Sequence, residues 1–138
     1  AGQRYRAAAD LVQASLARYR PCDPQRSYAP EEREPWDALC DRHLRAVEMA
    51  IRLFRTLERS RTAVPSDSFR DLLATMAKWR IVEDEDLWFR MRDLRNRIAR
   101  DYLPAQLAEI YALIHDRHGP ELLRLRDALA AALPAPGA

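Results

Sequence analysis

The side chains best suited to chemistry are gathered between positions 94 and 102, where the chain reads Leu-Arg-Asn-Arg-Ile-Ala-Arg-Asp-Tyr. Arginine carries a permanent charge on a planar guanidinium, which suits the oxygens of a phosphate group. An amide and a phenol hydroxyl can add hydrogen bonds beside it. Any phosphate site in this chain would have to be local, and Arg92, Arg95 and Arg100 are the candidates to contact the phosphate. The full candidate set is Arg92, Arg95, Asn96, Arg100 and Tyr102.

A helix beginning near Asp84 would position these residues. On an ideal helix, one set of apolar side chains lies within about 40° of Ile98, which predicts a buried stripe. The stripe consists of Leu87, Met91, Leu94, Ile98 and Tyr102. Arg95 lies about 60° from this direction, at the border between core and solvent, and Asn96 and Arg100 lie further round. Because Arg95 and Arg100 point about 140° apart, they converge poorly within one chain.

This segment resembles the signature of the HEPN family, the higher eukaryotes and prokaryotes nucleotide-binding domains. The signature is an Arg, usually followed by Asn, then a His five positions after the Arg and a Tyr two positions after the His. Arg95, Asn96 and Tyr102 match in register, whereas Arg100 stands in the His position. The chain is most similar to HepT-like toxins, which are paired with minimal nucleotidyltransferases in bacterial toxin-antitoxin modules. It also resembles nucleotidyltransferase substrate-binding subunits, and the likeness extends over residues 41–129.

The resemblance implies metal-independent RNA cleavage by a symmetric homodimer, without a cofactor. In that chemistry a His exchanges protons while an Arg stabilises charge on the phosphate. Arg95 can fill the second role, but Arg100 cannot fill the first because a guanidinium does not deprotonate in proteins. Loss of general acid-base catalysis costs about 10²- to 10⁴-fold, so cleavage should be impaired. The resemblance also makes Tyr102 the residue to which a partner nucleotidyltransferase attaches AMP.

Other interpretations of these residues stay open. Arg100 could be a solvated helix residue without a role, and Arg95 could be an arginine whose stem covers the core boundary. Tyr102 could be a core ring with only its hydroxyl at the surface. The sequence is also compatible with Arg100 as the natural residue, as the mark of a degenerate family member or as an introduced replacement. Functionally, the rivals are a non-catalytic subunit that presents substrates to a nucleotidyltransferase and a helical interaction protein without nucleotide chemistry.

Composition sets broader limits. The 138 residues include 23 basic and 21 acidic side chains, and the formal net charge of +2 is too small to predict nucleic-acid binding by itself. Arginines are spread over the whole chain, which favours a general compositional bias. Cys22 and Cys40 are too few for a disulfide framework. Since the chain lacks an apolar run of membrane-spanning length, we expect a cytoplasmic protein with reduced thiols and no membrane contact.

Two groups of residues invite a metal-site interpretation. The acidic run 83–86 precedes the central helix, and acidic residues favour the positive end of a helix dipole. His115 and His118 are spaced by three, but no third ligand is evident, and Gly119 with Pro120 suggests that a helix ends there. We therefore predict helix termini rather than a metal site.

Apolar periodicity predicts helices throughout the chain. Pro21 should end the first helix, Pro35 should open the second, Ser66 should cap the third and Pro104 should start the fifth. No strand pattern is present, so the predicted fold is a single all-α domain, an up-and-down helical bundle of four main helices plus shorter ones. The expected segments are helices over 3–20, 35–59, 66–79, 84–103, 104–118 and 121–132, a Pro-rich linker over 21–35 and a disordered tail over 133–138.

Overall fold

The computed structural model describes residues 1–100 and 103–132, and within these ranges the secondary structure consists of helices joined by connections, without a strand. This confirms the predicted fold class. A short π-helical segment, η1, separates the last two α-helices. The elements are α1 Gly2–Ala17, α2 Pro30–Arg61, α3 Phe69–Lys78, α4 Glu85–Arg100, α5 Pro104–Leu113, η1 Ile114–His118 and α6 Gly119–Ala132.

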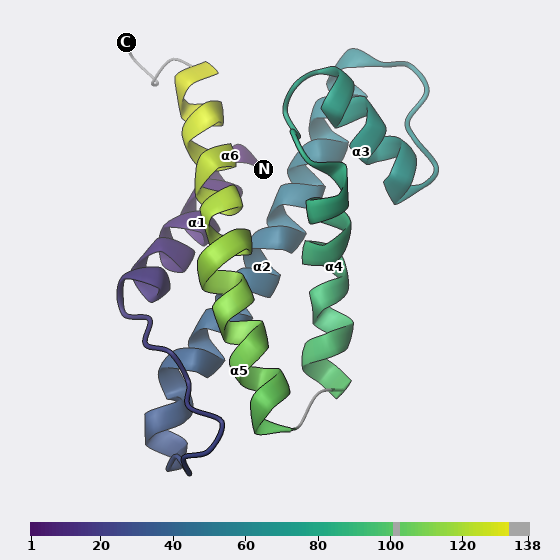
Figure 1. Cartoon of the computed structure of the whole chain (residues 1–138). Coiled ribbons are helices and arrows are strands. Elements are labelled where there is room, and N and C mark those ends of the chain that lie inside the picture. The colour runs from purple at the N-terminus through teal and green to yellow at the C-terminus, as the bar shows by residue number, and fades with distance from the viewer. Residues whose placement is uncertain (101–102, 133–138) are drawn as a thin grey trace.

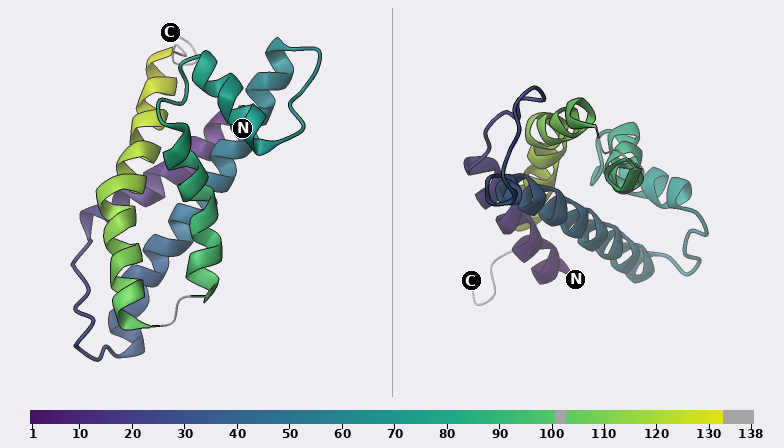
Figure 2. Two further views of the ribbon diagram at one scale, coloured as in Figure 1. Left: turned by 45° about the vertical axis from the view of Figure 1, so that its right-hand side comes forward. Right: turned by 90° about the horizontal axis from the view of Figure 1, so that it is seen from below.

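Helix α2, with 32 residues, is the element around which the bundle is built. It packs against α1 and α4, and α1 also packs against α6. Helices α5 and α6 run end to end through η1 as one long rod (Figure 1). The views in Figure 2 show α3 lying at the end of the bundle where α2 finishes and α4 begins. The four main bodies are therefore α1, α2, α4 and the α5–α6 rod.

Two groups of buried apolar residues fill the bundle. The larger group joins α1, α2, α3, α4 and α6 and includes Phe54, Trp88 and Met91, all fully buried. The smaller group lies where the second half of α4 meets α2 and α5, and Leu94 belongs to it. Its buried members are Trp36, Leu39, Cys40, Leu94, Ile110, Tyr111 and Ile114. The predicted stripe of α4 therefore faces the core, with Leu87 and Ile98 partly buried beside it.

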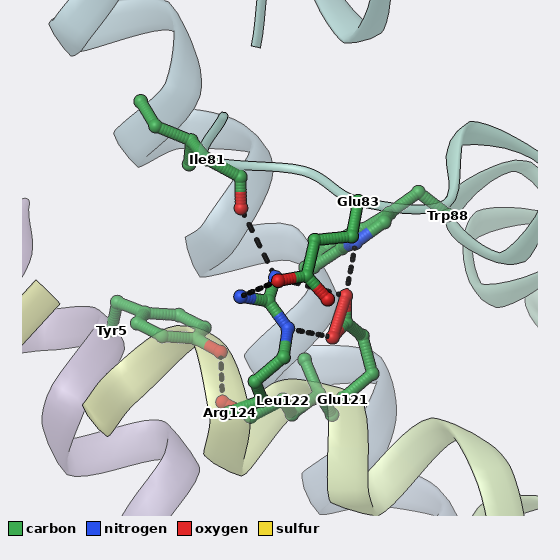
Figure 3. Close-up of polar contacts among 7 residues, drawn as sticks. All are labelled: Tyr5, Ile81, Glu83, Trp88, Glu121, Leu122 and Arg124. Carbon is green, nitrogen blue, oxygen red and sulfur yellow. Dashed lines mark hydrogen bonds and ion pairs between the residues drawn. The ribbon is translucent and has the colours of Figure 1, made fainter. Parts of the chain in front are cut away.

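A polar network holds the start of α4 in place (Figure 3). The carboxylate of Glu121 on α6 accepts a hydrogen bond of 3.0 Å from the indole Nε1 of Trp88 on α4. It also pairs with Arg124, whose Nη2 donates to the carbonyl of Ile81 at 3.0 Å. Arg124 lies 3.6 Å from the Glu83 carboxylate as well. These contacts join α6, the α3–α4 connection and α4, so they orient the helix that carries the candidate residues.

Helix α2 begins at Pro30, so the prediction that Pro35 opens it was wrong. Ala29 is extended, and its N–H donates to the Glu32 carboxylate at 3.0 Å, which satisfies a free donor at the helix start. Pro35 then lies inside the helix. The first helix ends at Ala17, before Pro21 rather than at it. The predicted linker over 21–35 is therefore a shorter connection over 18–29.

The start of α3 also differs from the prediction. The N-cap is Ser68, whose hydroxyl accepts a 3.0 Å hydrogen bond from the Asp71 N–H. Ser66 instead donates its N–H and its hydroxyl to the carboxylate of Glu58, at 2.7 and 2.5 Å. Glu58 is only 2% exposed, so these bonds satisfy a buried charge. A contact with the last turn of α2 thus takes the place of the local cap at position 66.

The boundaries of the central helix follow the predicted signals. Asp84 accepts a 3.1 Å hydrogen bond from the Leu87 N–H through Oδ1, which supports the helix-terminus interpretation of the acidic run. Helix α4 extends to Arg100, and residues 101–102 are outside the part of the chain that the structure describes. Leu103 is extended and Pro104 occupies the first position of α5, as predicted. None of the described helices combines the length and apolarity needed to cross a bilayer.

The prediction that a helix ends at Gly119 was wrong, because the rod continues through η1 into α6. Gly119 has an ordinary helical φ of −59°. A Cβ there would lie 2.7 Å from a side-chain carbon of Leu16 on α1 and 2.9 Å from the Ile114 carbonyl oxygen. Glycine is therefore favoured by the tight backbone of the η1 turn, where the Ile114 carbonyl cannot move aside as a Leu16 methyl can, and not by a helix stop. His118, expected at a helix end, lies inside the rod and is 1% exposed.

Candidate phosphate-binding site on α4

Arg95 presents its guanidinium to solvent from the middle of α4. The preceding residue, Leu94, is buried, but Arg95 itself is exposed. Its side chain makes no hydrogen bond or ion pair with any residue in 1–100 or 103–132. Since it neither covers the core nor pairs with an acid, the full set of guanidinium donors is available to a phosphate.

Arg100 and Asn96 are linked along the same helix. The Nε of Arg100 donates to the backbone carbonyl of Asn96 at 3.2 Å, and the Asn96 Nδ2 donates to Asp93 Oδ1 at 3.1 Å. Both side chains are exposed. Arg100 is thus held along the last turn, where a cation also complements the negative helix end. Its terminal nitrogens can contact an anion, but it offers no group that exchanges a proton near neutral pH.

Arg92 has a different environment. Its guanidinium carbon lies 4.2 Å from the ring centroid of Phe69 on α3 and 5.9 Å from that of Phe89. This cation–π contact draws the side chain toward α3. The three predicted phosphate ligands therefore form an arc around α4, in which Arg92 lies between Arg95 and Arg100. Their side chains do not converge on one point.

Two neighbouring features set the position of the arc. Leu94 anchors α4 in the smaller apolar group, and Arg97 lies 3.6 Å from the Glu109 carboxylate of α5. These contacts hold the second half of α4 near the α5–α6 rod. Tyr102, the expected AMP acceptor, lies outside the described residues, so its role stays a prediction.

A buried histidine pair was missed by the sequence analysis. His118 Nδ1 lies 3.1 Å from His43 Nε2, and the two side chains are 1% and 0% exposed. Burial lowers the pKa of His43 to about 3 and that of His118 to about 4, and Arg90 adds to the effect on His118. The available signal was the position of His43 on the apolar face of α2, between Cys40 and Val47.

The pair is a core contact between α2 and η1. No group of three or more His, Cys, Asp or Glu placed to hold a metal occurs in the part of the chain that the structure describes. Neither ring lines the pockets of about 240 and 290 Å³ found elsewhere on the molecule.

The helical bundle is consistent with a HEPN-type domain. Residues 14–129 match the family described as Ribonuclease HepT-like, and the chain belongs to this family. The match begins within α1, upstream of the likeness seen in the sequence, and ends in α6. No curated protein and no solved structure matches the chain.

Proposed function

We propose that this chain is the toxin subunit of a bacterial nucleotidyltransferase–HEPN toxin-antitoxin pair, with RNA cleavage impaired by Arg100. The observation that carries the proposal is the contrast between two arginines on α4. Arg95 is exposed and without an ion pair to the described residues, whereas Arg100 occupies the position where the family has its proton-exchanging His.

The proposed chemistry is cleavage by the neighbouring 2′-hydroxyl of RNA. That oxygen attacks the phosphorus, the 5′-oxygen leaves, and the phosphate gains negative charge in the transition state. Arg95 stabilises this charge with its guanidinium. One proton must leave the 2′-hydroxyl and one must reach the leaving oxygen, and a His serves such transfers near neutral pH. With Arg100 in that place, binding is retained and proton transfer is lost.

Substitution of Arg100 by His tests the proposal. Cleavage of a broad RNA pool should rise by about 10²-fold or more and should depend on a group titrating near pH 6.5. The measurement is the cleavage rate of purified, unmodified protein between pH 5 and 8, with growth inhibition on expression as a second readout.

Two matched variants control the experiment. Arg100→Gln removes the same arginine without supplying a proton-exchanging group, so it should give no gain. Adding Arg95→Ala to the Arg100→His protein should abolish the gain. Since both positions are exposed, stability should change by no more than about 0.5 kcal/mol. A folded Arg100→His protein that cleaves no RNA would contradict the ribonuclease proposal.

The alternative is a non-catalytic subunit that presents substrates to a nucleotidyltransferase. It is favoured by the same Arg100, because an arc of permanently charged side chains binds phosphate without moving protons. In that case Arg100→His should weaken nucleotide binding and yield no cleavage. Both functions require a small nucleotidyltransferase as partner, so a neighbouring reading frame of that kind would support either.

A further inference from the structure

A second concentration of arginines lies far from the α4 arc. A pocket of about 290 Å³ opens between the beginning of α1 and the second half of α2. Its charged lining consists of Arg4 from α1 and Arg52, Arg55 and Arg59 from α2, and among the described residues that line it none is acidic. In Figure 1 this region lies at the end of the bundle opposite the end of α4.

The pocket differs from an ordinary solvated helix face. On α2, Arg45 outside the pocket pairs with Asp41, and Arg52 in the pocket lining pairs with Glu48, in each case an acid one turn earlier. Arg55 and Arg59 lack this arrangement, because one turn before them stand Ile51 and Arg55 itself. Like charges at this spacing destabilise a helix. A bound anion would relieve the repulsion.

Among the described residues, no acid neutralises the other three arginines of the pocket. Arg4, Arg55 and Arg59 form no ion pair with the described residues, and Arg55 is partly buried. The adjacent Glu58 points elsewhere, since its carboxylate is buried against Ser66. Three unpaired guanidiniums from two helices therefore share one concave surface.

We propose that this pocket binds consecutive phosphate groups, independently of the α4 arc. Arg52 and Arg59 are seven residues apart, which places their Cα atoms about 10 Å apart along the helix. Each guanidinium carries five N–H donors, so the four arginines together offer more donors than the oxygens of one phosphate group can accept in pairs. A chain of phosphates can accept them, and the arginine fork matches phosphate oxygens in pairs.

Two sources carry this chemistry, the backbone of single-stranded RNA and a free oligophosphate. Fluorescence anisotropy with a labelled 12-nucleotide RNA measures the first, and calorimetry with inorganic tripolyphosphate measures the second.

The test protein is the full chain with Arg4, Arg55 and Arg59 changed to Gln, which keeps most of each side-chain stem and removes the charge. RNA affinity should fall at least tenfold in low salt. Its logarithmic salt dependence should become shallower by about 2, because each phosphate contact contributes about 0.7.

Matched controls separate a local site from net charge. Arg18, Arg20 and Arg117 are exposed and line no part of this pocket, so their change to Gln removes the same charge elsewhere. This variant should retain most of its affinity. Changing the three pocket residues to Lys should retain the salt slope, since the charge is preserved, but should lose part of the affinity, since the paired contacts of the fork are lost. Should the triple Gln variant fail to fold, Arg4→Gln and Arg59→Gln alone should each reduce the salt slope by about 0.7.

Each outcome is decisive. Selective loss of RNA affinity supports the site with a nucleic-acid backbone as its ligand, and selective loss of tripolyphosphate binding supports it with a free oligophosphate. Equal binding of both probes by the wild-type and pocket variants, or equal losses in the pocket and control variants, would overturn the proposal. These measurements do not involve cleavage, so failure of Arg100→His to cut RNA would leave them unaffected.

Discussion

At the scale of single residues, α4 shows how neighbours decide what an arginine can do. Arg92 is drawn onto the ring of Phe69, Arg97 reaches an acid on α5, and Arg95 is exposed with no such partner among the described residues. All three have the same intrinsic charge. Of the three, Arg95 alone is exposed and has neither a ring contact nor an ion pair among the described residues, which is why it is the strongest candidate for stabilising a phosphate.

Tyr102 provides a test of the proposed partnership. A cognate nucleotidyltransferase supplied with ATP should attach AMP to the Tyr102 hydroxyl. The added phosphate would bring negative charge beside Arg95 and Arg100 and should exclude RNA by repulsion and bulk. Mass spectrometry of the intact protein and of its peptides measures the modification.

The matched control is Tyr28→Phe, which removes a phenol hydroxyl from the 18–29 connection. Tyr102→Phe should abolish the modification, whereas Tyr28→Phe should leave it intact. AMP transfer that persists unchanged in Tyr102→Phe would refute the assignment of the acceptor.

At the scale of elements, the α5–η1–α6 rod depends on the junction at η1. There α1 approaches closely at Gly119, and α2 contributes His43 against His118. His43 Nδ1 and His118 Nε2 have no hydrogen-bond partner in the described part of the chain. Protonation would place an uncompensated charge in this interior, with Arg90, Arg97 and Arg117 adding repulsion at His118.

This junction should make the fold acid-sensitive. The pKa values of His43 and His118 lie near 3 and 4 in the folded protein and near 6.5 when unfolded. Between these pH limits the unfolded chain binds more protons than the folded protein. The contribution of the two histidines to the free energy of unfolding is therefore fully present above about pH 6.5 and is lost as the pH decreases. Each histidine contributes about 1 kcal/mol per pH unit within that window. Urea unfolding at pH 7.5, 6 and 5 measures the slope.

A double variant isolates the histidines from the acidic groups that also titrate. In His43→Leu with His118→Met, the decrease in stability between pH 6.5 and 5 should be much smaller than in the wild type. An unchanged slope in a folded double variant would show that other groups govern the acid sensitivity.

At the scale of the whole molecule, the helix geometry motivates the prediction of a second copy. Arg95 and Arg100 lie on one continuous helix and point about 140° apart, so a single chain presents them on different sides. A two-fold axis beside α4 would bring the arc of each copy opposite the other and create a shared cleft.

We therefore predict a symmetric homodimer in solution. Light scattering coupled to size exclusion should give twice the 16.0 kDa of one chain at micromolar concentrations. Arg95→Ala tests binding and not assembly, so its mass should be unchanged while its RNA affinity falls. A monomeric mass across the micromolar range would count against the shared cleft.

Local signals in the sequence were sufficient for much of this architecture. The apolar stripe of α4, the acidic residues at its start and Pro104 at the start of α5 act within one or two helical turns. Periodicity therefore predicted the all-α bundle, and the register of Arg95 and Asn96 indicated the family that the match over residues 14–129 confirms.

Tertiary contacts decided the remainder. Ser66 donates hydrogen bonds to the buried carboxylate of Glu58 and does not cap α3. Gly119 lies in close contact with Leu16 inside a continuous rod and does not end a helix. His118 is buried because α2 brings His43 to it from 75 positions away in the chain. Such choices depend on which segments meet in space, and burial then makes an unsatisfied group costly enough to override a local preference. Short-range sequence patterns do not indicate which distant segments pack against one another.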